Sequence, residues 1–210
     1  MSPYGQRPID YGADVVMQSS TKSLSGHSDL LGGVLTTNDK ELDEKLHFIL
    51  KATGAVPSPF DNWILLRSTK TLSLRYQRSC DNAMKIAEWL YKKNYTKKLL
   101  YPGLESHPQF SLAAKQQLNP NGERIFGNMI SFDIGSEEKR DNFLERLEIF
   151  SLAESLGGVE SLVCVPYDMT HAAVPVESKL EMGITKSLIR LSIGIEDCSD
   201  LIDDLNSSFS

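Results

Sequence analysis

A short apolar run that ends in hydroxyl groups and a lysine constrains this chain more than any other feature. Residues 15–17 (Val-Val-Met) lead into residues 18–22 (Gln-Ser-Ser-Thr-Lys), and a glycine-rich turn follows at residues 23–33. Three consecutive apolar residues between polar ones predict a short strand that is buried on both faces of a sheet. Hydroxyl groups at the end of such a strand suit a phosphate, and the neighbouring lysine suits a covalent bond to a carbonyl carbon. Pyridoxal phosphate requires both, so one interpretation of this stretch is a site for that cofactor.

A plainer interpretation also fits these residues. A lysine that follows a strand is commonly a solvated charge, and clusters of serine, threonine and glycine commonly form loops. Short motifs match by chance often enough that this spacing alone leaves both interpretations open. Residues elsewhere in the chain must decide between them.

The composition predicts a globular protein that binds neither nucleic acid nor a membrane. Its 210 residues suffice for one large domain or two small ones. The 22 basic and 28 acidic residues give a net charge of −6, which excludes a strongly basic surface. The chain has no run of about 20 apolar residues and no secretory signal. Cys80, Cys164 and Cys198 are far apart and lack metal-site spacing, so we expect free thiols, a cytoplasmic location and no metal.

Hydrophobic periodicity and turn residues divide the chain into strands and helices. We expect strands at residues 15–17, 33–37, 98–101, 128–134, 149–152, 162–165 and 188–195. We expect one helix that starts with an N-cap at Asn38 and stops at Gly54, and another that is capped by Ser136. The other expected helices run from 61 to 92, from 108 to 118 and from 198 to 205. The helix at 61–92 is long enough to bridge two lobes, with a boundary near residue 70. Beyond it, helices and strands mix without strict alternation, which predicts an α+β lobe.

Three polar features interrupt the apolar segments of the second half. Arg190 lies within a strand, where it either points to solvent or offers a planar fork to a carboxylate. Glu154 and Ser155 begin a polar turn, which is either a hairpin-type connection or a loop that brings Ser155 to a ligand. His171 either has a structural role, which fits it better, or acts as a titrating group.

Taken together, seven stretches resemble one family, the pyridoxal-phosphate enzymes of cysteine and methionine metabolism. The lysine motif, Asp14-Val-Val-Met-Gln-Ser-Ser-Thr-Lys22, is the most specific of them. The others are residues 54–63, 69–75, 101–108, 152–162, 169–171 and 189–197. The resemblance covers nearly the whole chain. It implies an α/β fold of type I, similar to aspartate aminotransferase, with the end of the cofactor-binding large domain at residues 1–70 and an α+β C-terminal small domain at residues 71–210.

The resemblance also implies roles for the residues around the lysine. Lys22 would bind pyridoxal phosphate covalently and later carry protons, while Ser19 and Thr21 would hydrogen-bond the cofactor phosphate. Gln18 and Ser23 depart from the histidine and the aromatic residue that are more usual in the family. Neither departure removes a catalytic group.

A second set of implied roles concerns the substrate, a small molecule of the amino-acid class. Arg190 would bind the substrate α-carboxylate, helped by Ser155, and Glu154 matches the acidic residue of members that act at the γ-carbon. The expected reaction is γ-elimination from cystathionine, which yields cysteine, 2-oxobutanoate and ammonia. Members that make cystathionine, or that cleave it at the β-carbon, remain alternatives. The family assembles as tetramers built from dimers, so we expect a homo-oligomer.

The chain resembles only the C-terminal half of these enzymes. The aspartate that binds the pyridine nitrogen and the sheet partners of the first strand are therefore expected upstream of Met1. A partial sequence and a truncated, non-catalytic chain both fit this observation.

Overall fold

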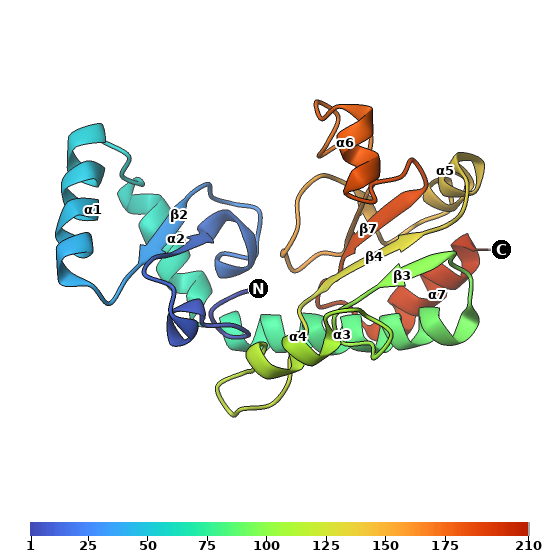
Figure 1. Ribbon diagram of the computed structural model, residues 1–210, viewed down its shortest axis with the longest axis horizontal. Helices are drawn as coiled ribbons and strands as arrows, with labels where there is room; N and C mark the ends of the chain where they lie inside the picture. Colours follow the sequence, from blue (N-terminus) through green and yellow to red (C-terminus); the bar gives the residue numbers. More distant parts are fainter. Residues whose placement is uncertain (210) are drawn as a thin grey trace.

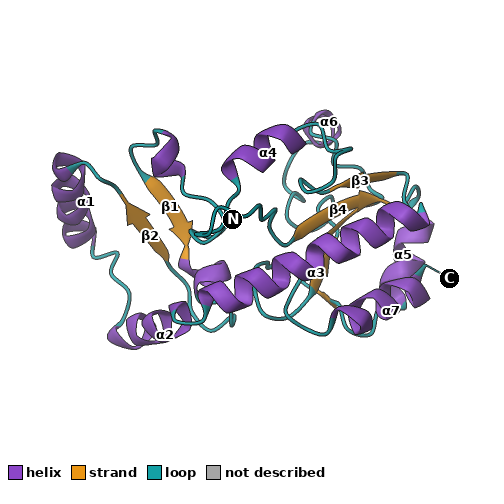
Figure 2. Cartoon of the chain, turned by 90° about the horizontal axis from the view of Figure 1, so that it is seen from below, coloured by secondary structure: helices purple, strands orange, loops and turns teal. Residues whose placement is uncertain are grey.

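The computed structural model of the protein describes residues 1–209 and has two lobes joined by one long helix (Figure 1). We call residues 1–69 the first lobe and residues 98–209 the second lobe. Helix α3 (Leu72–Lys93) starts at the first lobe and runs along the sheet of the second lobe (Figure 2).

The first lobe contains a small sheet and two helices. Its elements are a 3-10 turn (Pro8–Tyr11), β1 (Val16–Ser19), a π-helical turn (Ser20–Leu24), β2 (Gly33–Thr36), α1 (Lys40–Thr53) and α2 (Pro59–Thr69). Strands β1 and β2 are antiparallel, and Ser19 pairs with Gly33. This pairing brings both ends of the glycine-rich turn together beside the lysine motif.

The prediction of a strand buried on both faces at residues 15–17 is wrong. β1 starts one residue later, Met17 is 69% exposed, and the partner of β1 within residues 1–209 is the antiparallel β2. Other large apolar side chains of this lobe, such as Phe48 and Trp63, are also exposed. The physical reason is that a strand is buried on both faces only where other elements cover both faces of its sheet. Helix α1 shows how little of this lobe is covered, because none of its own residues is buried.

Helix α1 begins and ends on capping residues. The expected N-cap at Asn38 is wrong by one position, because the Asp39 carboxylate accepts the hydrogen bond from the Leu42 amide at 2.9 Å. A carboxylate satisfies an unpaired amide of the first turn and also interacts favourably with the helix dipole. Gly54 ends the helix at φ +69°, which confirms the expected stop.

The single helix expected at residues 61–92 is two helices. α2 ends at Thr69 and α3 begins at Leu72. Thr71 accounts for the break, because its hydroxyl donates to the Ser68 carbonyl at 3.1 Å and offers the backbone an alternative to the helical hydrogen bond. The domain boundary expected at this point stays a prediction.

The second lobe is built on a five-stranded sheet in the order β3-β4-β7-β6-β5. The strands are β3 (Lys98–Leu100), β4 (Met129–Asp133), β5 (Ser151–Leu152), β6 (Leu162–Cys164) and β7 (Leu188–Ser192). The helices are α4 (Phe110–Gln116), α5 (Glu137–Glu145), α6 (Val176–Glu181) and α7 (Cys198–Ser208). The Ser136 hydroxyl caps α5 by accepting from the Lys139 amide, as expected.

One face of this sheet forms the main core. Alternate residues of β7 point to opposite faces, so Ile189 and Leu191 are fully buried while Arg190 lies on the other face. Residues of α3, including Ile86 and Leu90, and residues of α7 pack against the buried face. The face that carries Arg190 is left for contacts with loops.

The turn at residues 154–158 is not a hairpin. β5 and β6 pair in parallel, so the chain must cross from the end of one strand back to the start of the other. The loop at residues 153–160 makes this crossing, and its tip reaches the first lobe. The hairpin interpretation of Glu154 and Ser155 is therefore wrong.

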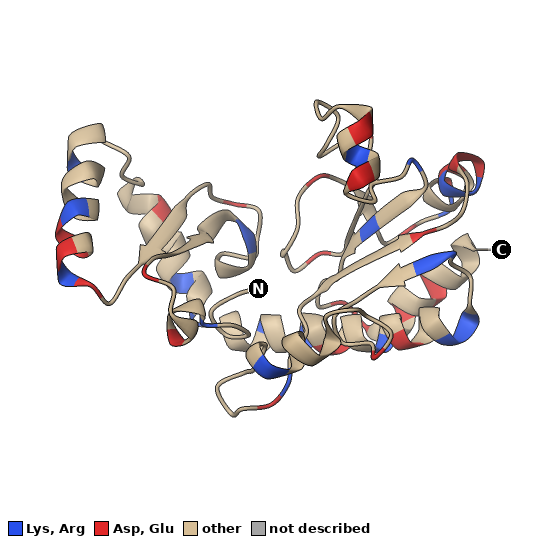
Figure 3. Cartoon of the chain, in the orientation of Figure 1, with Lys and Arg blue, Asp and Glu red and all other residues tan. Residues whose placement is uncertain are grey.

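Two further properties concern the hydrophobicity of the helices and the distribution of charge. Within residues 1–209, every helix is too short or too polar to cross a membrane. Acidic and basic residues are interspersed over both lobes, for example along α1 (Figure 3).

Candidate active site

Lys22 lies in the π-helical turn directly after β1. The turn is anchored by the buried Ser20, whose amide donates to the Gly32 carbonyl at 2.9 Å. Lys22 itself departs from helical geometry, with φ −91° and ψ −132°. This local departure interrupts the turn at Lys22, where the side chain leaves the backbone toward the second lobe.

The Lys22 amine meets a residue of the second lobe that is 133 positions away. Its Nζ donates to the Ser155 hydroxyl at 3.2 Å. Both residues line a cavity of about 640 Å³, a size typical of sites for small molecules. Other residues that line the cavity are Thr21, Ser28, Asp29, Leu30, Leu31 and Asp61.

The crossing loop at residues 153–160 is bound to the first lobe by backbone and side-chain hydrogen bonds. The Val159 amide donates to the Gly26 carbonyl at 2.9 Å, and the Ser28 hydroxyl donates to the Glu160 carboxylate at 2.8 Å. These two contacts lie on either side of His27. They fix the loop against the segment that follows Lys22.

Gly157 sets the distance between the two segments. Its amide donates to the Ser192 hydroxyl at 2.8 Å, and a Cβ built on it would lie 2.7 Å from Oγ of Ser23. Only glycine allows the loop to approach the π-helical turn at Ser20–Leu24, which we call the lysine turn, this closely. The φ of +75° at this position also favours glycine.

Arg190 points toward the crossing loop rather than to open solvent. Its Nη2 donates to the Glu154 carbonyl at 2.8 Å and to the Ser155 carbonyl at 3.4 Å. Its Nε and Nη1 have no hydrogen-bond partner among residues 1–209. The neighbouring thiol, Cys164, has a raised pKa because it is buried, although the positive charge of Arg190 acts in the opposite direction. Arg190 thus holds the loop backbone through Nη2, while Nε and Nη1 stay unpaired among the described residues.

Ser19 and Thr21 lie on either side of Ser20 but differ in their contacts. The Thr21 hydroxyl accepts from the Gly32 amide at 2.9 Å and donates to the Gly32 carbonyl at 3.4 Å. The half-buried Ser19 hydroxyl has no hydrogen-bond partner in the described part of the chain. The cavity therefore brings together Thr21, Lys22 and Ser155, whereas Ser19, Glu154 and Arg190 are outside its lining.

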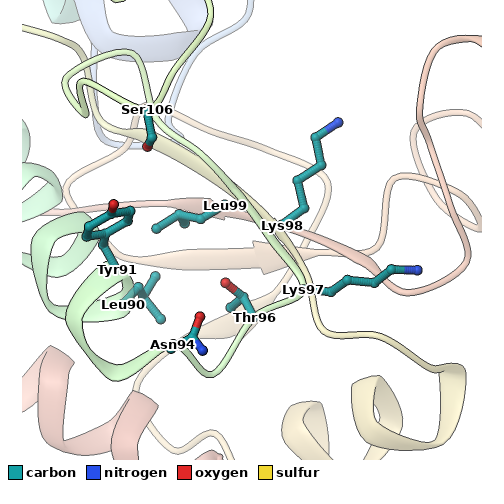
Figure 4. A pocket seen from close by; sticks show the side chains of 8 residues that line it. All are labelled: Leu90, Tyr91, Asn94, Thr96, Lys97, Lys98, Leu99 and Ser106. Atoms are coloured by element: carbon teal, nitrogen blue, oxygen red, sulfur yellow. The ribbon is translucent and has the colours of Figure 1, made fainter.

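A second depression on the surface carries no comparable chemistry. It has a volume of about 440 Å³ and lies between the C-terminal end of α3 and β3 (Figure 4). Its two cations, Lys97 and Lys98, extend away from Leu90 and Tyr91. His171 lies before α6, hydrogen-bonded to Thr170, and does not line the Lys22 cavity.

Comparison with known proteins identifies the family of this chain. The family model described as Cys/Met metabolism PLP-dependent enzyme matches residues 1–210. The chain belongs to this family. Pyridoxal phosphate is the cofactor of the Cys/Met metabolism PLP-dependent enzymes, as expected from the lysine motif.

Individual relatives support the assignment. A cystathionine gamma-lyase from Bacillus subtilis is 50% identical over 207 residues, which cover 99% of this chain and 53% of that protein. A cystathionine beta-lyase from Lactococcus lactis is 47% identical with the same coverage. The crystal structure of a cystathionine gamma synthase from Xanthomonas oryzae, in complex with aminoacrylate and cysteine, is 43% identical with a TM-score of 0.94 and covers 100% of this chain and 53% of that one.

These comparisons confirm the expected fold class and show how much of the length of its relatives the chain covers. The chain has the α/β fold of this family of pyridoxal-phosphate enzymes. It spans about half the length of the curated relatives that it matches.

The residues of the cavity fit the cofactor chemistry. A primary amine faces a cavity large enough for a substituted pyridine, and hydroxyl groups precede it in the chain. Gly32, whose backbone binds Thr21, also lies close to Ser20, since an added Cβ would lie 2.7 Å from the serine Oγ.

Sequence reasoning missed two residues that shape this site. Arg75 is buried on α3 and contacts the lysine turn, and Gly157 permits the contact between the lobes. The sequence offered one signal for the burial of Arg75, since this arginine lies between Leu74 and Tyr76 in an expected helix. For Gly157, a pair of glycines in a loop gives no sign of which distant segment it approaches.

Proposed function

We propose that this chain carries the lysine side of the active site of a carbon–sulfur lyase that cleaves L-cystathionine by γ-elimination. The products are cysteine, 2-oxobutanoate and ammonia. The observation that supports the proposal most directly is the 3.2 Å hydrogen bond between Lys22 Nζ and Ser155 Oγ at the wall of the cavity. Two segments 133 residues apart meet there around a single amine.

Lys22 has two roles in this proposal. Its amine binds pyridoxal phosphate covalently, and after release it moves a proton from the substrate Cα and returns protons later in the reaction. The cofactor supplies electron withdrawal from the substrate when it is bound. Ser155 orients the amine, because its oxygen accepts the hydrogen bond that holds Nζ at the cavity.

Ser19 and Thr21 hold the cofactor phosphate in the same proposal. Thr21 is already oriented by the Gly32 backbone, and Ser19 has a hydroxyl without a protein partner in residues 1–209. Hydroxyl donors to a phosphate dianion form charge-assisted hydrogen bonds, which are stronger than neutral ones.

Arg190 binds the substrate carboxylate. Its Nε and Nη1 are the donors that remain after Nη2 has bound the Glu154 and Ser155 carbonyls. A planar guanidinium matches a carboxylate with two parallel hydrogen bonds. Glu154, at the start of the same loop, contacts the distal part of the substrate in our proposal, because it matches the acidic residue of family members that act at the γ-carbon.

A second candidate is another reaction of the same family. Relatives named cystathionine beta-lyase are 47% identical to this chain, and a cystathionine gamma synthase superposes with a TM-score of 0.94. The products separate the three activities. γ-Elimination from cystathionine gives cysteine and 2-oxobutanoate, β-elimination gives homocysteine and pyruvate, and the synthase forms cystathionine from cysteine and an activated homoserine.

The test of the proposal is chemical trapping at Lys22. The protein is incubated with pyridoxal phosphate, reduced with borohydride and digested, and the modified peptide is identified by mass spectrometry. We expect the label on Lys22, and we expect Lys22→Ala to lose both the label and the release of 2-oxobutanoate. Lys51→Ala, at an exposed position on α1, is the control and retains both. A label on another lysine, or lyase activity in Lys22→Ala, contradicts the proposal.

A further inference from the structure

A buried guanidinium donates hydrogen bonds to the backbone of the lysine turn. Arg75, on the first turn of α3, is 9% exposed. Its Nη1 donates to the Ser23 carbonyl at 3.0 Å, and its Nη2 donates to the carbonyls of Leu24 and Ser68 at 3.1 and 3.0 Å. Its Nε donates to the Thr71 hydroxyl at 3.1 Å.

No carboxylate within residues 1–209 pairs with this cation. Arg75 makes only the four hydrogen bonds to uncharged oxygens, and burial lowers its pKa from the ordinary value. Burying an unpaired charge is costly, so a guanidinium in this position needs a compensating role. Its contacts indicate that role, since two of its four acceptors are the carbonyls immediately after Lys22.

Those two carbonyls belong to the end of the π-helical turn. In that turn the Ser25 amide donates to the Ser20 carbonyl and the Gly26 amide donates to the Lys22 carbonyl. The carbonyls of Ser23 and Leu24 are not used by either bond. Buried backbone carbonyls need donors, and Arg75 supplies them.

Gly26 makes the close contact possible. A Cβ at this position would overlap Nη1 of Arg75 and crowd its Cζ. The φ of Gly26 is +75°, a conformation that glycine adopts without strain. The glycine that follows the lysine motif is thus required by the guanidinium as well as by the turn.

We propose that Arg75 is a positioning residue that fixes the direction in which Lys22 presents its amine to the cavity. It joins the end of α2, the break before α3 and the lysine turn through one rigid planar group. Lysine has a single flexible ammonium in place of this fork and cannot satisfy the same set of oxygens in the same geometry. The inference rests on the proposed function of Lys22.

Hydrogen–deuterium exchange tests the positioning role without any cofactor. In Arg75→Ala we expect exchange of the amides at residues 22–27 to rise about tenfold, because the turn loses two hydrogen bonds to a charged donor. Peptides from β7, at residues 188–192, keep the wild-type exchange rate. Arg75→Lys shows a smaller rise in the turn. Arg67→Ala, which removes an exposed arginine at the end of α2, is the control and matches the wild type.

Trapping with pyridoxal phosphate and borohydride gives the second measurement. The rate of labelling at Lys22 falls about tenfold in Arg75→Ala and is partly restored in Arg75→Lys, while Arg67→Ala labels normally. Gly26→Ala displaces the guanidinium and gives the same loss, whereas Gly122→Ala, with φ of +80° and no atom within 4 Å of the added Cβ, does not. If Arg75→Ala does not fold, the comparison of Gly26→Ala with Gly122→Ala and the result for Arg75→Lys still test the positioning role.

Two results overturn the inference. One is unchanged exchange and labelling in the variants of Arg75 and Gly26. The other is an equal rise of exchange in the turn and in β7, which would mean that Arg75 only stabilises the whole fold. If the wild-type protein carries no label on Lys22, the proposed function fails, and the exchange data still decide whether Arg75 holds the turn.

Discussion

Arg190 and Lys22 each bind the crossing loop through one nitrogen atom. Lys22 is held by one hydroxyl, and Arg190 uses one nitrogen to hold the crossing loop while its other donors are free. At this scale the identity of a side chain matters more than its charge. A lysine in place of an arginine keeps the charge and loses the planar fork.

Arg190→Lys is expected to raise KM for cystathionine about tenfold or more, with a smaller change in kcat. In the role that we propose for Arg190, an ammonium would offer the substrate carboxylate only a point charge and could not make two parallel hydrogen bonds. Steady-state kinetics of the variant measures both constants. Arg67→Lys, which changes an exposed arginine on α2, serves as the control. An unchanged KM in Arg190→Lys would count against its role at the carboxylate.

Asp133 makes stability depend on pH. Burial by itself would raise its pKa, but hydrogen bonds from Thr185, Ser187 and the Gly135 amide outweigh burial and lower the pKa below its ordinary value. A group whose pKa is depressed in the folded state stabilises the fold above its unfolded-state pKa, and this stability is lost as the pH falls through the folded-state pKa.

Asp133→Asn is therefore expected to lower the free energy of unfolding by about 1–3 kcal/mol at pH 7. The difference from the wild type should start to shrink as the pH falls below about 4, the ordinary pKa of an aspartate, and should be lost as the pH falls through the lower folded-state pKa. Urea denaturation at a series of pH values measures it. Asp203→Asn, an exposed position on α7, should show no such pH-dependent difference. A gap that stays constant down to pH 2 would contradict the assignment.

At the scale of elements, the site depends on how the crossing loop meets the lysine turn. The loop exists because β5 and β6 are parallel, which forces the chain across the sheet toward the first lobe. The break between α2 and α3 has a related effect, since it places Arg75 at the start of a helix and beneath the turn. Neither element contains an unusual residue type. Their positions create the site.

Gly157→Ala tests this contact. The added Cβ would lie 2.7 Å from Oγ and 3.0 Å from the amide nitrogen of Ser23, so the loop and the turn must move apart. We expect labelling of Lys22 by pyridoxal phosphate and borohydride to slow at least about tenfold, because Ser155 moves with the loop. Gly122→Ala shares the positive φ without the close contact and should cost only about 1 kcal/mol of stability. Equal labelling in both variants would refute the role of the contact.

At the scale of the whole molecule, the two lobes bury their apolar residues to different extents. The second lobe and α3 share a closed core that includes Ala83, Ile130 and Leu205, each fully buried. In the first lobe, by contrast, Leu66 and Phe60 are 68% and 66% exposed. Burial of apolar surface is the main stabilising contribution to a fold, so among residues 1–209 the second lobe with α3 supplies most of the stability.

Ile189→Ala should lower the free energy of unfolding by about 2–5 kcal/mol, because it opens a cavity at the centre of the sheet. Leu74→Ala removes a leucine that is 72% exposed on α3, and its effect should stay within about 0.5 kcal/mol. Urea denaturation compares the two variants. Similar losses in both would contradict a core centred on β7.

Local features of this fold could be predicted because neighbouring residues determine them. The strand expected at residues 188–195 follows from alternating apolar residues and is observed as β7 at Leu188–Ser192, three residues shorter at its end. The helix after Ser136 follows from its capping hydroxyl. The family followed from the lysine motif together with distant stretches. The N-cap of α1 and the break in the helix expected at residues 61–92 were missed because a carboxylate at Asp39 and a hydroxyl at Thr71 compete locally for backbone groups.

The sequence by itself determined most of the strands and helices and the family that the chain belongs to. Only the tertiary structure decided that Lys22 meets Ser155, that Arg190 turns toward the crossing loop and that Arg75 lies buried behind the lysine turn. The physical reason is one of range. Periodicity and capping depend on residues a few positions apart, whereas these contacts depend on which faces of distant elements pack together.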